Sequence, residues 1–388
     1  MLWKKQSTFI SAFCSLAAVY GASSAPIPLY SLYKGELSLT NAALSLSAVL
    51  YFAGALAALL VLARLSDYCG RKPLTLSTLI MSAIGCVLFY SLQTEWMFLL
   101  ARLVQGLSCG LGASCIAAWL VDTGGSKLGA IASSSAPMAG LAAGSFGSGL
   151  LVQYGRGAGD MYVILLALIA VCALCTAFST ETVISAPGAL RSLRPAVRLP
   201  RAIRPYLPAA GAVFVGTWAV GGFYQAFAAP LAAEQLQTNS TLVAAAVFAC
   251  LQAPNMLGST LSGRMTPEKA QLWGISAFFL SMGGIVLALW FHGVVPFLCV
   301  TALAGIAWGL GYTGSVQILM RHITAADRAG VLSAICLISY SGAALPNLVV
   351  SRIASGWSLL AIAAAYTLVV GAAWLITAVC VWKQMARH

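Results

Sequence analysis

The sequence predicts an all-α membrane protein with twelve transmembrane helices arranged as two pseudo-symmetric bundles of six. Three observations lead to this fold class. The 388 residues are 60% hydrophobic and only 8% charged, with a mean hydropathy of +0.91, whereas a soluble chain carries about 25% charged residues. The chain breaks into apolar stretches of roughly 20 residues, the length that a helix needs to cross ~30 Å of hydrocarbon. Short motifs of the first half also recur in the second half.

Polar breaks between the apolar stretches define the twelve expected spans. They cover residues 8–30, 41–62, 74–92, 97–120, 129–153, 161–179, 207–229, 241–261, 271–290, 295–319, 330–350 and 357–381. The first stretch follows Lys4 and Lys5 but is too long for a signal peptide and has no convincing cleavage site, so we expect an uncleaved first span.

The basic residues predict the orientation of the spans, because Lys and Arg concentrate in cytoplasmic loops. With the N-terminus inside, only Lys34, Arg156 and Arg352 fall outside and Arg102 lies within the membrane, so the other seventeen of the 21 basic residues are cytoplasmic. We therefore expect a multi-pass protein of the cell inner membrane with both termini in the cytoplasm. The net charge of +12 then reflects topology and anionic lipid headgroups, and no nucleic-acid partner is expected.

A longer basic loop follows the sixth span. Residues 181–205 carry five arginines, and we expect them to form a cytoplasmic linker with room for a short surface helix. The predicted domains are an N-terminal six-helix bundle over residues 1–180 and a C-terminal six-helix bundle over residues 206–388.

The two predicted bundles share short motifs at equivalent spans. Residues 63–66, 110–112 and 127–132 recur as residues 263–266, 309–311 and 328–333, at offsets of 199 to 201. Each match is short, but their common offset predicts two parallel repeats related by an axis along the membrane normal.

Three segments resemble known signatures. The loop 63–72, A-R-L-S-D-Y-C-G-R-K, resembles the G-x-x-x-D-x-x-G-R-[RK] signature of the major facilitator superfamily, with Ala63 in place of the usual first glycine. Residues 102–106, R-L-V-Q-G, are similar to the R-x-x-Q-G signature of the drug:proton antiporter branch. Residues 140–149 look like the glycine-rich motif of that branch, with Ser145 where a proline is common. The resemblance implies a major facilitator fold and secondary transport.

The first signature contains charges that could form a conformational latch. Asp67 and Arg71 are four residues apart on a helical turn, Gly70 supplies backbone freedom, and Asp122 ends the fourth span at the same membrane face. The resemblance implies that these charges hold the cytoplasmic side closed when the cavity faces out. The alternative is that they are loop charges that only set the topology. In the second half Pro267 replaces Asp67, so any latch there is degraded.

Arg102 lies about five residues inside the fourth span, where a charge costs ~2.5 to 3.5 kcal/mol on insertion scales. We therefore expect it to face a wet cavity or an internal partner. The alternative is an arginine that extends to the outer interface. Its equivalent in the second half is Thr301, so this charge belongs to one half only.

No carboxylate lies in the middle of a span. All nine acidic residues map to loops or span ends, and the three histidines lie in loops or at the C-terminus. If protons drive transport, the carrier must therefore be a span-end carboxylate such as Glu36 or Glu95, or Arg102 must act together with the substrate.

The resemblance implies a cavity lined by spans 1, 4, 7 and 10, with contributions from spans 2, 5, 8 and 11. Amide and aromatic side chains in those spans are the candidate substrate-binding residues, together with Arg102. They are Tyr20, Tyr51, Gln105, Trp218, Tyr224, Gln225, Gln252, Asn255, Trp308, Tyr312, Gln317, Tyr340 and Asn347. Such a pocket suits a mainly apolar organic molecule with a carboxylate or phenolate for Arg102.

These observations predict a secondary transporter that moves a small amphipathic organic solute by alternating access, as a monomer that exports by proton antiport. One alternative is an importer or facilitator of a small organic anion, and another is a non-transporting membrane receptor or scaffold. The sequence has no Walker loop, no zinc-ligand spacing and no Ser-His-Asp arrangement, so we expect no enzyme activity, metal or cofactor.

Overall fold

The computed structural model is helical and describes residues 2–184, 187–193, 197, 199–324, 327–353 and 356–385. No strand occurs in these ranges. Twelve helical segments are long and apolar enough to cross a membrane, which confirms the predicted fold class. They cover residues 5–36, 41–62, 71–90, 95–125, 128–153, 158–178, 207–235, 241–262, 267–290, 294–321, 330–353 and 359–383. Linker positions 185–186, 194–196 and 198 and the predicted cytoplasmic C-terminus from 386 lie outside the described residues.

The contacts between residues divide the chain into two compact units. The first unit comprises residues 1–39 and 50–195, and the second comprises residues 40–49 and 196–388. Each unit is described by itself.

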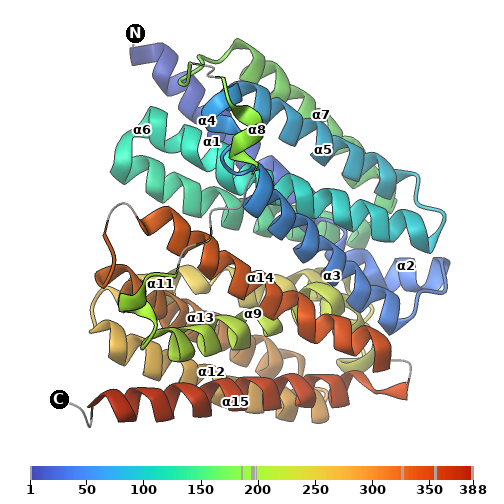
Figure 1. Cartoon of the computed structure of the whole chain (residues 1–388). Helices are drawn as coiled ribbons and strands as arrows, with labels where there is room; N and C mark the ends of the chain where they lie inside the picture. Colours follow the sequence, from blue (N-terminus) through green and yellow to red (C-terminus); the bar gives the residue numbers. More distant parts are fainter. Residues whose placement is uncertain are drawn as a thin grey trace. The chain divides into compact units, whose positions relative to one another are not determined.

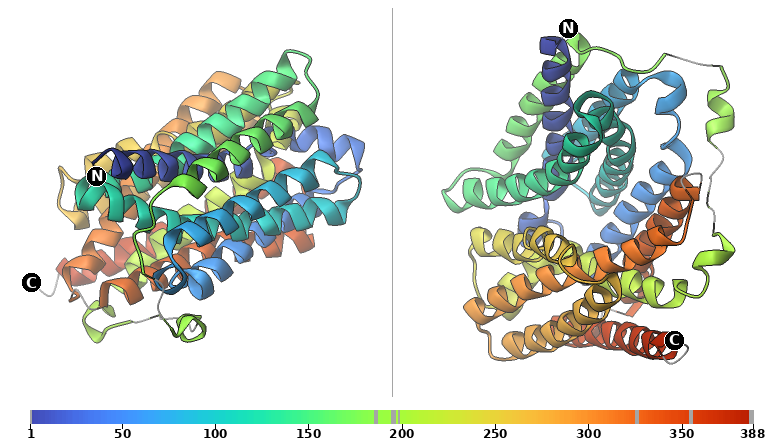
Figure 2. Two further views of the ribbon diagram at one scale, coloured as in Figure 1. Left: turned by 90° about the horizontal axis from the view of Figure 1, so that it is seen from above. Right: turned by 90° about the vertical axis from the view of Figure 1, so that its left-hand side faces the viewer.

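The first unit contains the helices drawn in blue to green in Figure 1. They are α1 (Leu2–Ser24), a 3-10 turn (Ile27–Leu29), α2 (Tyr30–Glu36), the C-terminal half of α3 (Asn41–Ala57), whose N-terminal half belongs to the second unit, a π-helical turn (Ala58–Leu62), α4 (Ser66–Cys69), α5 (Arg71–Tyr90), α6 (Glu95–Gln153), α7 (Ala158–Phe178) and α8 (Ala189–Ser192). Helix α6 contains two spans, because the backbone turns at Gly125, which adopts φ +75°. Helix α1 lies along both α6 and α7 (Figure 2).

The second unit contains the helices drawn in green to red in Figure 1. They are a 3-10 turn (Arg201–Ile203), α9 (Leu207–Pro230), a π-helical turn (Leu231–Gln235), α10 (Thr241–Gln252), α11 (Asn255–Ser262), α12 (Pro267–Trp290), α13 (Val294–Arg321), α14 (Arg328–Ile353) and α15 (Leu359–Met385). The eighth predicted span is interrupted between α10 and α11, at Pro254. Helix α9 packs against α13, α14 and α15.

Each unit has an apolar core. In the first unit the core surrounds Trp119, a fully buried residue of α6, and includes Leu16 of α1 and Leu74 of α5. In the second unit a core surrounds Phe214 of α9 and includes Ile203 and Leu319.

Glycines of α6 allow it to touch α3 backbone to backbone. A Cβ atom at Gly106 would collide with the carbonyl oxygen of Tyr51, and one at Gly110 would collide with the carbonyl oxygen of Ala55. We call this contact the first glycine seam. Small residues of this kind bring helices close enough for dense packing inside a membrane, where burial from water supplies no driving force between helices.

The second unit repeats this contact at equivalent positions. A Cβ atom at Gly305 of α13 would collide with the carbonyl oxygen of Leu251, and one at Gly309 would collide with that of Asn255. In this second glycine seam both the glycines and the carbonyls that they face lie 199 or 200 residues after their counterparts. The predicted internal repeat is therefore visible in the packing.

We predict that Gly106→Ala destabilises the protein by ~1 to 3 kcal/mol, because the added methyl group meets backbone that cannot move without shifting α3. The matched control is Gly283→Ala on α12, where nothing lies within 4 Å of the new Cβ atom. There the better helix propensity of alanine should leave stability unchanged or raise it by ~0.5 to 1 kcal/mol. Thermal melting of the purified variants in detergent tests both, and equal melting temperatures would contradict the seam.

Candidate functional site

A network of charges joins three helix ends of the first unit, and Arg71 is its centre. The Arg71 Nε atom donates to Asp122 Oδ2 at 3.0 Å, and its Nη1 atom donates to Asp67 Oδ1 at 2.6 Å and to Ser66 Oγ. The arginine side chain is 11% exposed, whereas the side chains of Asp67 and Asp122 are 52% and 32% exposed. The structure thus brings the predicted latch residues together.

Gly70 makes this arrangement possible. It separates α4 from α5 with φ +100°, a conformation that residues with a side chain rarely adopt. A Cβ atom at Gly70 would also come within 2.6 Å of a carboxylate oxygen of Glu181. The glycine is therefore required both by the backbone turn and by the side chain that fills the space beside it.

Glu181 caps the N-terminus of α5 and is the network member that sequence reasoning missed. Its two carboxylate oxygens accept hydrogen bonds from the backbone N–H groups of Arg71 and Lys72, both at 2.9 Å. The next residue, Thr182, donates its hydroxyl to Asp122 Oδ2 at 3.1 Å. A carboxylate at a helix N-terminus is favoured by the helix dipole and by the free N–H groups. The start of the linker is therefore attached to the charge network.

The corresponding place in the second unit holds a weaker pair of reversed polarity. Arg321, which is equivalent to Asp122, donates to Glu268 at 3.5 Å, and both side chains are about half exposed. Gln271 stands at the position of Arg71 and donates to Ser315 Oγ at 3.0 Å. An exposed pair of this kind contributes ~0 to 1 kcal/mol. The charge network as a whole is therefore a feature of the first unit.

Arg102 is enclosed within the first unit. Its side chain is 0% exposed, and Nη1 donates to the carbonyl oxygen of Ser23 at 2.8 Å and to Gln105 Oε1 at 2.7 Å. The guanidinium carbon lies 4.6 Å from the ring centroid of Tyr51 and 6.0 Å from that of Tyr30. These contacts direct the side chain toward α1 and the aromatic rings of α2 and α3.

Gln105 and Arg102 together cap the end of α1. Gln105 Nε2 donates to the carbonyl oxygen of Ala22 at 2.8 Å. In a continuous helix that carbonyl would accept the N–H of residue 26, but residue 26 is proline and has none. The R-x-x-Q-G segment therefore supplies side-chain donors where Pro26 removes a backbone donor.

Two donors of Arg102 are unused. Among the described residues, neither Nε nor Nη2 has a hydrogen-bond acceptor. No carboxylate compensates the charge either, since all nine acidic residues lie in the described part and none of them is buried. The positive charge is thus held by neutral oxygen atoms and aromatic faces, and it has free capacity for an anionic or carbonyl partner.

The second unit has a neutral contact at the equivalent place. The hydroxyls of Tyr224 and Thr301 form a 2.9 Å hydrogen bond, and Thr301 is the equivalent of Arg102. Tyr224 is fully buried and stacks on Phe297. The structure thus places the predicted binding residue Tyr224 in a packed contact between α9 and α13.

Four predicted binding residues of the second unit form an aromatic cluster. The ring of Trp218 lies 4.7 Å from Tyr340, 6.0 Å from Trp308 and 6.4 Å from Tyr312, measured between centroids. Trp308 is 6% exposed, whereas the other three rings are half-buried. These spacings and their tilted or edge-on geometry suit mutual aromatic packing and leave ring faces for a planar apolar group.

The remaining predicted residues are not brought into these clusters by any described contact. Tyr20 is half-buried and packs against the core of the first unit. Gln225 is 6% exposed, and Gln252 and Asn255 are half-buried on either side of the break at Pro254. Of the two other amides, Gln317 donates to Ser262 at 3.4 Å and Asn347 donates to Ala343 at 2.8 Å.

Comparisons with known proteins agree with this architecture. The model of a family described as Major Facilitator Superfamily matches residues 9–346. Among solved structures, a mutant of the nucleoside transporter NupG is similar over 99% of each chain, with a TM-score of 0.71 and 14% sequence identity. At that identity the likeness shows the fold alone. No curated protein sequence matches the chain, and none of these findings identifies the drug:proton antiporter branch.

We predict that Glu181→Ala destabilises the first unit by ~1 kcal/mol, because two N–H groups at the start of α5 lose their acceptor. Amide hydrogen exchange at Arg71 and Lys72 should accelerate. The matched control is Glu95→Ala, an exposed acidic residue in the first turn of α6, where Thr94 caps the helix by accepting from the Met97 N–H. Exchange that is equally fast in both variants would show that Glu181 is not a cap.

Proposed function

The chain belongs to the major facilitator superfamily of secondary transporters, and on that premise we propose that it exports a small amphipathic organic solute in exchange for protons. Its twelve apolar helices make it a multi-pass membrane protein. We place it in the cell inner membrane as a monomer with both termini in the cytoplasm, on the distribution of its basic residues.

The buried guanidinium of Arg102 is the observation that carries this proposal. The Arg102 side chain is 0% exposed, has two donor atoms without an acceptor and has no carboxylate partner. Burying such a charge lowers the stability of the protein, and this cost favours a role for the charge in transport. An anionic group on the solute would satisfy those donors. Residues 102–106 are similar to the antiporter signature, so we also expect Arg102 to take part in coupling solute transport to protons.

The aromatic cluster of the second unit supports an amphipathic solute. Trp218, Tyr312 and Tyr340 are half-buried, so their rings offer apolar surface without being locked into a sealed core. Planar aromatic groups stack favourably on such rings, at ~0.5 to 1.5 kcal/mol for each pair beyond simple burial. We assign recognition of the apolar part of the solute to this cluster.

The charge network supports alternating access. Its bonds join α4, α5 and α6 to the segment after α7, and each bond is exposed enough to break and re-form at low cost. We propose that the network is intact in one conformation and parted in the other, so that it sets the balance between the two states.

An importer or facilitator of a small organic anion is the second candidate. The lack of a buried carboxylate favours this candidate. Without such a group the first and fourth spans have no carboxylate that could carry a proton across the membrane. In that case Arg102 would bind the anion without exchange for protons. The name of the similar structure, a nucleoside transporter, adds no substrate to either candidate at 14% identity. A receptor or scaffold that moves no solute is the third alternative. Solute flux into proteoliposomes would exclude it, and the lack of any flux would support it.

We predict that Asp67→Asn and Arg71→Ala each reduce turnover at least tenfold while melting within a few degrees of the wild type, because an ion pair whose carboxylate is half exposed contributes little to stability. Lys34→Ala, which removes a charge from the last turn of α2 on the predicted outer side, serves as the control. Flux should be measured in proteoliposomes with radiolabelled aromatic carboxylates. Normal turnover in both variants would leave these residues with a role in topology only.

For Arg102 we predict that the alanine variant binds an aromatic carboxylate ten- to a hundredfold more weakly, the equivalent of ~1.5 to 3 kcal/mol for a charge-assisted hydrogen bond. Arg102→Lys should restore part of the affinity, since it keeps the charge but loses the planar fork. If the charge serves proton coupling instead, both variants should exchange solute yet lose accumulation driven by a pH gradient.

The control for Arg102 is Gln105→Leu, which removes the other side-chain bond to the end of α1 but keeps the positive charge. Equal defects in Arg102→Ala and Gln105→Leu would mean that the two residues only anchor α1. Full activity of Arg102→Ala would overturn both functional roles of the charge.

A further inference from the structure

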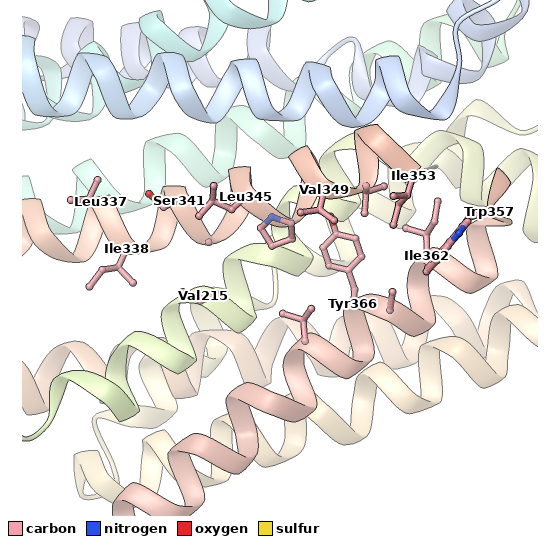
Figure 3. Close-up of a pocket in the computed structure, with 15 residues that line it drawn as sticks. Val215, Leu337, Ile338, Ser341, Leu345, Val349, Ile353, Trp357, Ile362 and Tyr366 are labelled. Carbon is pink, nitrogen blue, oxygen red and sulfur yellow. The ribbon is translucent and has the colours of Figure 1, made fainter. Parts of the chain in front are cut away.

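An apolar groove of about 650 Å³ lies between α9, α14 and α15 in the second unit (Figure 3). Leu345, Val349 and Ile353 of α14 form one wall, and Ile362 and Tyr366 of α15 form the other. None of the described residues that line the groove is charged. Leu345 and Val349 are about 60% exposed, so the groove is open along its length and is not an enclosed cavity.

The sequence explains why α14 leaves this space. At Gly342 a Cβ atom would come within 2.7 Å of the Val215 backbone, so α14 touches α9 closely at that point. Pro346 follows one turn later inside α14, where a proline removes a backbone hydrogen bond and bends the helix. Ala365 of α15, whose side chain is small, also lines the groove.

The groove contains a hydroxyl that the protein itself does not satisfy. Tyr366 is 1% exposed, its ring packs at 4.9 Å on Phe223, and its Oη atom has no hydrogen-bond partner among the described residues. Figure 3 shows the ring extending from α15 toward Val349 on α14. A buried hydroxyl is normally paired, so this donor indicates an acceptor that a bound molecule would supply.

One end of the groove has the residues of a membrane interface. Ile353 and Trp357 line that end, and Trp357 is 44% exposed, as expected of an indole at the level of lipid headgroups. Arg352, in the last turn of α14, is exposed and forms no ion pair with any described residue. The groove thus starts beside a free positive charge and continues between apolar walls.

The Tyr366 hydroxyl lies toward the same end. Tyr366 is seven residues after the first residue of α15, which corresponds to ~10 Å along the helix axis. Side chains of a helix lean toward its N-terminus, so the hydroxyl is closer to the interface than the backbone of its own residue.

We propose that this groove binds a phospholipid with an anionic headgroup. Arg352 pairs with the phosphate, Tyr366 donates its hydroxyl to an ester carbonyl, and one acyl chain lies against Leu345, Val349 and Ile362. The lateral opening favours a molecule of the surrounding bilayer over a transported solute, because Leu345 and Val349 face out of the protein along the whole wall.

The test is the thermal melting of the purified full-length protein in detergent, titrated with dioleoyl phosphatidylglycerol or dioleoyl phosphatidylcholine. We expect the anionic lipid to raise the melting temperature at about tenfold lower concentration than the zwitterionic one. Arg352→Gln should abolish that tenfold preference. The matched control is Arg156→Gln, an exposed arginine on the same predicted side of the membrane but in the first unit, which should keep it.

Tyr366→Phe separates the groove from general surface attraction. Without lipid it should melt like the wild type, because the lost hydroxyl has no partner among the residues that the structure describes, but it should need about three- to tenfold more phosphatidylglycerol for the same shift. Val349→Phe, which adds bulk on the exposed wall, should reduce the amount of this lipid retained in native mass spectrometry. Equal responses to the two lipids, an equal loss in Arg156→Gln, or a lower melting temperature of lipid-free Tyr366→Phe would overturn the proposal.

Discussion

Close contact between backbones at the two glycine seams is the constraint on which the rest of the structure depends. At Gly106 and Gly309 no side chain of any kind fits, so the distance between the paired helices is set by backbone atoms. Backbone contacts are insensitive to the side chains elsewhere on the helices. Each unit could therefore keep the same helix positions while the residues around the seam changed, which is why the repeat is clear in the packing and faint in the sequence.

The two units use this shared frame for different chemistry. Position 102 faces the end of α1 with a guanidinium, whereas its equivalent, Thr301, forms a neutral hydrogen bond with Tyr224. The charge network around Arg71 lies in the first unit, and the aromatic cluster around Trp218 lies in the second. A protein built from two copies of one bundle can divide recognition in this way, because each copy tolerates side chains that would be incompatible in the other.

Local periodicity predicted some of these features and could not predict others. Helix geometry and the spacing of residues along one segment predicted the spans, the Asp67–Arg71 pair and the position of Trp308 and Tyr312 on one helix face. The cap formed by Glu181 joins residues 110 positions apart. Such contacts depend on how helices pack, so an acidic residue after the sixth span had no sequence signal beyond its proximity to a helix end. The partners of Arg102 on α1 were unpredictable for the same reason.

The anchoring of the linker at both ends has a mechanical consequence. Thr182 is bound to the charge network of the first unit, α8 packs against α4 of the same unit, and Ile203 is fully buried in the core of the second unit, so residues 193–202 connect the two. Ten residues can extend to about 35 Å, which is about the diameter of a small domain. Loop-closure entropy changes by only ~0.6 kcal/mol when such a segment doubles in length. The exact length of the tether should therefore have little effect on the stability of the protein.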